Sequence, residues 1–188
     1  ARAVAGDAAL GGKIEEILEN FSYRSPFSLL ELERIGDIRM KRVEQSQKRH
    51  PGLTNVKSGL GGLADIDLVA QAYAAHYGSQ IPELRLRRTD EILSALGRQC
   101  MIEPTEAASL REAYAFLSDT EKALRIGSGK SVNTLPDSGI ELARVARLMG
   151  FGNIRKFQKR LEDVLILCRE RYERLMTALQ KEAGRRGS

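Results

Sequence analysis

The clearest pattern of apolar and polar positions lies in the last third of the chain. Between Ile154 and Leu179, apolar residues recur at steps of three and four, and polar residues fill the positions between them. This spacing places the apolar side chains on one side of a helix of about seven turns. The stripe consists of Ile154, Phe157, Leu161, Val164, Leu165, Cys168, Tyr172, Leu175, Met176 and Leu179. We expect Gly152-Asn153 to begin this helix and Gly184 to end it.

Shorter stripes with the same period predict further helices. They are a weak helix over 12–19, a long one from Ser28 to about Lys48, one over 63–77 that Gly78 ends, one capped by Thr89, one entered through Pro104, and one that Ser138 and Glu141 open and Gly150 ends. No stretch alternates apolar and polar residues over the length of a strand. The sequence therefore predicts an all-α fold, a single bundle-like domain of six or seven helices with a long C-terminal helix.

The composition indicates one domain with its own core. The 188 residues are 42% hydrophobic and 29% charged, with a net charge of +5, and this length suits one domain spanning residues 1–188. No apolar run reaches the roughly 18 residues of a membrane span. Cys100 and Cys168 each lie in an apolar helical stretch, so both are predicted to be small core residues. These features predict a soluble domain located in the cytoplasm.

A glycine-rich stretch before the helix at 63–77 does not read as routine helix packing. Gly59, Gly61 and Gly62 fall within four positions, and Lys57 precedes them. Backbone N–H groups left uncovered at a helix N-terminus can hold an anion, to which Lys57 would add charge. The same glycines can instead form a tight turn that lets two helices approach closely. Both interpretations remain open from the residues alone.

Two aspartates follow this turn. Asp65 and Asp67 are two positions apart, so on a helix their side chains point roughly 200° apart and cannot share one metal ion. Asp65 is expected to cap or brace the glycine turn, and Asp67 to pair with Gln71 at i+4. A lysine, three glycines, two aspartates and a glutamine thus form the candidate site, in which we expect contact with a nucleotide or with a neighbouring domain. No residue is predicted to be catalytic or to bind a metal.

Several spaced motifs, in order along nearly the whole chain, carry a family resemblance. They are Val4-Ala5-Gly6-Asp7, Arg39-x-x-Arg42-Val43-Glu44, Lys57-x-Gly59-x-Gly61-Gly62-Leu63-x-Asp65-Ile66-Asp67, Ala113-Tyr114-x-Phe116-Leu117 with Glu121, Thr134-Leu135-Pro136, and Met149-Gly150-Phe151. Together they resemble the glutamine synthetase adenylyltransferase family, whose relatives include the uridylyltransferases of the PII protein. The chain departs from the usual family residues at Leu60, Ala64 and Asp67.

The resemblance implies a division of labour. In this family a separate nucleotidyltransferase domain, with a Gly-Ser turn and a strand-borne Asp-x-Asp pair, binds magnesium and ATP, and the helical domain packs behind it. The parent enzyme transfers AMP to glutamine synthetase, or removes it, in nitrogen regulation that involves PII. We expect this chain to be the supporting or regulatory helical domain, inactive alone, with residues 1–11 as a linker from the missing catalytic domain. Gly61-Gly62 and Asp65-x-Asp67 lie too close together to be the catalytic signature.

A second hypothesis comes from the net charge of +5. A helical module could bind a protein partner or RNA through its basic surface. Basic residues are interleaved with acidic ones along the chain, however, which is typical of a solvated surface rather than of a nucleic-acid site. Nucleic acid is therefore not the expected partner.

Overall fold

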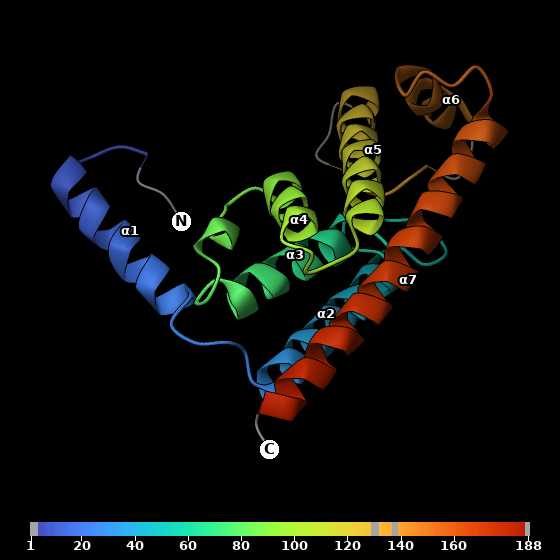
Figure 1. The fold of residues 1–188 in the computed structure, drawn as a ribbon. Coiled ribbons are helices and arrows are strands. Elements are labelled where there is room, and N and C mark those ends of the chain that lie inside the picture. Colours follow the sequence, from blue (N-terminus) through green and yellow to red (C-terminus); the bar gives the residue numbers. More distant parts are fainter. Residues whose placement is uncertain (1–3, 129–131, 137–138, 187–188) are drawn as a thin grey trace.

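The computed structural model describes residues 4–128, 132–136 and 139–186, and within them the fold is all-α (Figure 1). The elements are α1 (Ala8–Ser22), α2 (Leu29–Arg49), α3 (Leu63–Tyr77), the short 3-10 helix η1 (Pro82–Leu84), α4 (Thr89–Arg98), α5 (Pro104–Ser128), α6 (Gly139–Leu148) and α7 (Ile154–Arg186). Strands are absent from these ranges, where the only β pairing is an isolated antiparallel bridge between Asn55 and Thr134. The predicted fold class and the long C-terminal helix are confirmed.

Three helices, α4, α5 and α7, pack against α3, which lies in the middle of the molecule (Figure 1). α3 contacts α4, α5 and α7, while α2 lies along α7 and α6 packs against α5 and α7. The apolar stripe predicted for α7 forms much of the buried surface, from Phe157 at its start to Leu179 near its end. At the start of α7, the ring of Phe157 packs against those of Phe116 and Phe151. In the described part of the chain, no helix has the length and apolarity that crossing a membrane requires.

Local signals fixed several helix ends as expected. Ser28 and Glu31 form a full capping box at the start of α2, because each side chain bonds to the backbone N–H of the other. Asn153 Oδ1 accepts from Arg155 N at 2.7 Å at the start of α7. Gly150 follows α6 with a φ of 78°, a left-handed conformation that favours glycine.

Three boundary predictions were wrong. Thr89 is the first residue of α4 rather than its cap, and Arg88 holds the N-cap position. α7 continues through Gly184 to Arg186, and Gly184 lies inside the helix where α7 passes Leu29 of α2. α1 runs from Ala8 to Ser22 and so extends beyond both ends of the helix expected over 12–19. The Ser138 half of the capping pattern before α6 lies outside the described residues.

The two cysteines have different surroundings. Cys168 is buried in α7, as predicted. Cys100 is exposed and follows the end of α4 with a φ of 52°, so the prediction of a core position was wrong. The N–H of Cys100 bonds to Gly97 O, and that of Met101 bonds to Leu96 O. This bonding pattern ends a helix with one left-handed residue, a position that glycine usually takes.

Candidate functional site

The glycine corner (residues 57–67) begins at a turn that Asn55 organises. The Asn55 side-chain oxygen accepts from the N–H groups of Lys57 and Ser58 at 3.0 and 2.9 Å, and its carbonyl accepts from Gly59 N. The next residue, Val56, donates its N–H to Asn133 O at 2.9 Å. A side chain that binds backbone N–H groups two and three residues ahead stabilises a tight turn. The corner is thereby attached to the segment between α5 and α6.

The glycines allow a close approach of backbone to backbone. Gly61 has a φ of 70°, and a Cβ there would overlap the carbonyl oxygen of Leu165 in α7. A Cβ at Gly59 would lie 2.5 Å from Asn55 O, and one at Gly62 would lie 2.8 Å from Val56 O. Side chains would not fit at these three positions without movement of the backbone. This geometry matches the tight-turn interpretation, and the corner is where α3 meets α7.

The N–H groups of the corner donate within the chain. Gly61 N lies 2.7 Å from Asp65 Oδ2, and Gly62 N lies 3.1 Å from Gly59 O. The next two N–H groups, of Leu63 and Ala64, bond to Val56 O and Lys57 O at 3.0 Å. These are the donors that anion binding at the start of α3 would use. In this arrangement they already have acceptors, which favours a structural role for the turn.

Asp65 forms a buried ion pair with Arg39 of α2. Arg39 Nε lies 2.6 Å from Asp65 Oδ1, and the exposed fractions of the two residues are 3% and 0%. The other guanidinium nitrogens of Arg39 donate to Ser58 O at 3.0 Å and to Gly59 O at 2.7 Å. One arginine therefore binds both the carboxylate and the backbone of the turn. The prediction that Asp65 braces the glycine turn is confirmed.

The carboxylate also influences ionisable groups on α7. Burial raises the pKa of the Cys168 thiol to about 12, and the charge of Asp65 adds to that increase. The pKa of Tyr172 is raised by the same two causes in the same order. Arg169 Nη1 lies 4.0 Å from Asp65 Oδ2 and provides a second cation near the carboxylate. Asp65 is therefore a charge held between α2, α3 and α7.

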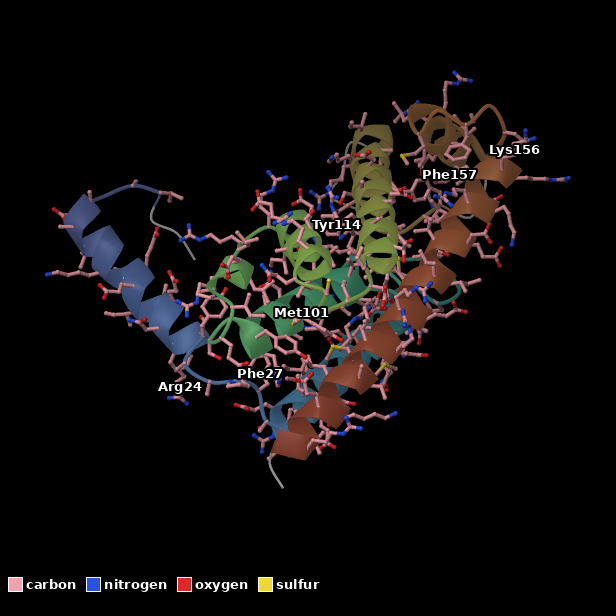
Figure 2. All side chains as sticks on the ribbon, in the orientation of Figure 1. Arg24, Phe27, Met101, Tyr114, Lys156 and Phe157 are labelled. Carbon is pink, nitrogen blue, oxygen red and sulfur yellow. The ribbon has the colours of Figure 1, made fainter. Side chains whose placement is uncertain are left out.

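Asp67 faces other helices. It accepts a hydrogen bond from Thr89 Oγ1 of α4 at 2.6 Å. Burial, and then the charge of Asp67, raise the pKa of Tyr114, which lies on the α5 side of the same region (Figure 2). Within the described residues Gln71 makes no hydrogen bond to Asp67, so the expected i+4 pair is replaced by the contact to α4. Asp65 and Asp67 bind different helices, and they do not fit a shared magnesium site.

The candidate residues differ in how much of each is available to a partner. Gly61, Gly62 and Asp65 are buried, Gly59 and Asp67 are partly buried, and Lys57 and Gln71 are exposed. The Lys57 side chain is 51% exposed, and its Nζ lies 3.3 Å from Glu121 Oε1. Among the described residues, no group of three His, Cys, Asp or Glu side chains could hold a metal ion. A partner could therefore touch the rim of the corner directly, but not its centre.

Arg39 is the residue of the site that sequence reasoning missed. It was recognised as part of a motif, but it was not proposed as a site residue. A signal was present, because Arg39 continues the spacing of Leu32, Ile35 and Val43 on the inner side of α2. A cation in the middle of an apolar stripe is buried only when it has a partner. That rule points to a buried acid, which Asp65 supplies.

The fold and the glycine corner define the class of protein. It is an all-helical domain in which the buried ion pair between Arg39 and Asp65 holds a glycine turn between three helices. The chain matches the model of the GlnD PII-uridylyltransferase family over residues 37–180. It is 35% identical to the bifunctional glutamine synthetase adenylyltransferase/adenylyl-removing enzyme of Agrobacterium fabrum, over 98% of this chain and 19% of that protein. The chain belongs to this family of adenylyl- and uridylyltransferases, and it is a helical domain of such an enzyme.

Two other relatives with the same description show how the similarity is distributed. The enzyme of Pseudomonas putida is 35% identical over 86% of this chain, and that of Caulobacter vibrioides is 33% identical over all of it. The chain spans only 16% and 19% of these two proteins, respectively. Most of each relative's length therefore has no counterpart in the 188 residues.

Proposed function

We propose that the chain is the supporting helical domain of a bifunctional enzyme that transfers AMP to glutamine synthetase and removes it. The observation that carries the proposal is the similarity to enzymes of that description over 86–100% of the chain. Residues 1–188 then form one accessory domain, and the segment before α1 leads to a nucleotidyltransferase domain elsewhere in the parent protein. Glutamine synthetase and the PII protein are its partners through the parent, in the cytoplasm.

The proposed catalytic domain supplies the groups that this chain does not. ATP and magnesium bind there rather than at the glycine corner, where Asp65 is paired with Arg39 and Asp67 with Thr89. The contribution of this chain is positional: the glycine corner is a fixed element, and its rim contacts the catalytic domain. Lys57, on the rim of the corner, and Gln71, one turn beyond the corner on α3, contact the catalytic domain. Gly59 and Asp67 border this contact. Gly61, Gly62 and Asp65 hold the shape of the corner. The support for this assignment is the burial of the last group and the exposure of the first.

The test uses the full-length parent enzyme. Lys57→Glu and Gln71→Ala change exposed side chains, so they should lower AMP transfer while the thermal midpoint stays unchanged. Asp65→Ala should lower both, because it removes the support of the corner. Lys156→Glu is the matched control for Lys57→Glu, since Lys156 is exposed and points away from the molecule near the start of α7 (Figure 2).

Two outcomes would contradict the proposal. The first is full AMP transfer and removal by the rim variants and by Asp65→Ala, with unchanged stability. The second is RNA binding by the 188-residue chain with a steep dependence on salt, since such a slope reports release of counterions from nucleic acid. That result would favour a nucleic-acid module over a supporting domain.

A further inference from the structure

α1 differs from the other helices because none of its residues is buried. It stands apart from the rest of the molecule in Figure 1. Its large apolar side chains are between 38% and 69% exposed, and they recur at steps of three and four: Leu10, Ile14, Ile17, Leu18 and Phe21. We call these five residues the α1 stripe. In a folded domain, an apolar stripe with this spacing normally packs against the hydrophobic core.

The contacts of α1 with the body of the domain are polar. Glu15 pairs with Arg87 at 2.9 Å, and Glu19 pairs with Arg85 at 3.3 Å. At 100° per residue, these glutamates lie roughly 140° around the helix axis from the centre of the α1 stripe. The helix therefore turns its charged side toward the body, and most of its apolar side faces away from the body. The stripe is left uncovered by the described part of the chain.

A helix with this arrangement needs an external contact for its stability. Isolated helices of about 15 residues are marginal in water, because their stability comes mainly from packing of the apolar face. α1 has 15 residues, two of them adjacent glycines at 11 and 12. Exposed apolar stripes of this kind mark surfaces that bind another protein or domain.

The comparisons indicate where the occupant lies. The PII-uridylyltransferase model matches from residue 37 and so leaves out α1. The similarity to the Caulobacter vibrioides adenylyltransferase covers the whole chain, so α1 lies inside it. That relative is about five times as long as its matched part. α1 is thus shared with long adenylyltransferases, which have other domains to place against it.

We propose that the α1 stripe docks on the nucleotidyltransferase domain of the parent enzyme, through an apolar surface of that domain. This inference rests on the proposed function and adds to it the residues of a second domain contact. The stripe continues at Phe21 into a hollow of about 530 Å³ that is lined by Phe27, Ile35 and Leu68, among others. Phe27 lies on the connection from α1 to α2 (Figure 2). An apolar side chain of the catalytic domain fits beside Phe21 at this end.

Hydrogen exchange of the α1 amides, in the parent enzyme and in the 188-residue chain, tests the inference. In the 188-residue chain α1 should exchange fast, and in the parent it should be protected by a factor on the order of tenfold or more. Ile17→Asp/Phe21→Asp should abolish the protection in the parent and leave the urea midpoint of the 188-residue chain unchanged. Ile17→Ala/Phe21→Ala should do the same, and it separates docking from helix propensity because alanine favours helix.

The matched control places two carboxylates on another side of the same helix. Ala9→Asp/Asn20→Asp changes exposed residues outside the stripe, so protection in the parent should remain. Equal exchange of α1 in the parent and in the 188-residue chain would overturn the inference. A stripe-dependent dimer of the 188-residue chain in sedimentation would also overturn it, since a second copy would then be the occupant. A lower urea midpoint for the stripe variants would mean that the body of the domain covers the stripe.

The two proposals can fail separately. If the stripe variants leave α1 protection intact while Lys57→Glu lowers AMP transfer, the docking surface is wrong and the supporting role stands. If neither set of variants has an effect in the parent, both are wrong.

Discussion

Replacing Asp65 with alanine should cost about 4 kcal/mol of folding free energy. Arg39 would remain buried at 3% exposure without its carboxylate, and removing one partner of a buried ion pair costs about 3–5 kcal/mol. Gly61 N would also lose its acceptor, which alone costs about 1–3 kcal/mol. The two losses overlap, since water admitted to the space left by the carboxylate can bond to both donors. The total is a large part of the 5–15 kcal/mol that stabilises a typical domain.

Urea unfolding of the 188-residue chain, followed by circular dichroism, measures this cost. With an m-value of about 2 kcal/mol per molar urea, the midpoint should fall by about 2 M. Arg39→Met should also destabilise, but Arg39→Met/Asp65→Ala should cost less than Arg39→Met and Asp65→Ala added together, because no buried charge is left unpaired. Asp119→Asn, which removes only the exposed pair with Lys122, should cost less than about 1 kcal/mol. A cost below about 1 kcal/mol for Asp65→Ala would refute the reasoning that the ion pair holds the corner.

Three further predictions concern single positions. Gly61→Ala should cost about 3 kcal/mol or more in thermal unfolding, because it adds left-handed strain to an overlap with the backbone of α7. The control Gly36→Ala, whose new Cβ meets no atom within 4 Å in α2, should be neutral or stabilising. Equal effects of the two changes would contradict the packing argument. An alkylating reagent should label Cys100 quickly and Cys168 only on unfolding, since Cys100 is exposed and Cys168 is buried. Mass spectrometry with a Cys100→Ser control measures the two labelling rates. Equal rates for the two thiols would contradict the prediction. Burial and the charge of Asp65 raise the pKa of Cys168 from 9.0 to about 12, so between these values the native state keeps a proton that the unfolded state loses. Stability should therefore fall as pH rises from about 9 toward 12. Cys168→Ala should flatten that decline between about pH 9 and 11, and an unchanged slope would contradict the assignment.

The helices were predictable because each one carries its own signal. The period of three and four residues, the helix start at Ser28 and the stop at Gly78 are local, and the structure keeps them. The errors at helix ends arose where tertiary contacts overrode a local preference. Gly184 stays helical because α7 packs against α2 at that point. Cys100 takes a left-handed conformation usually given to glycine, which its residue type does not signal.

The site was predictable in part. The geometry of a helix alone showed that Asp65 and Asp67 point in different directions, and the structure confirms that they bind different helices. Their partners could not be read from the pattern, because Arg39 is 26 positions away from Asp65 and Thr89 is 22 positions away from Asp67. The acceptors of the corner amides include Asp65 itself, so whether those amides were free depended on the side-chain packing of α3. Only the fold decides between an anion site and a locked turn.

The locked turn has a consequence for where a catalytic domain can bind. A glycine turn with free amides and free carboxylates would attract phosphate or metal by itself. In this corner the amide of Gly61 is bonded to Asp65, and Asp65 is neutralised by Arg39, so the strongest charges have no capacity left for a ligand. Recognition must then use groups whose bonds are weak or absent. The exposed rim at Lys57 and the α1 stripe meet that condition, since the Lys57 side chain is 51% exposed and pairs with Glu121 at 3.3 Å, and the stripe presents five apolar side chains. Because α3 and the corner are fixed to α7, a domain held at the Lys57 rim would be oriented by the packing of α3 on α7.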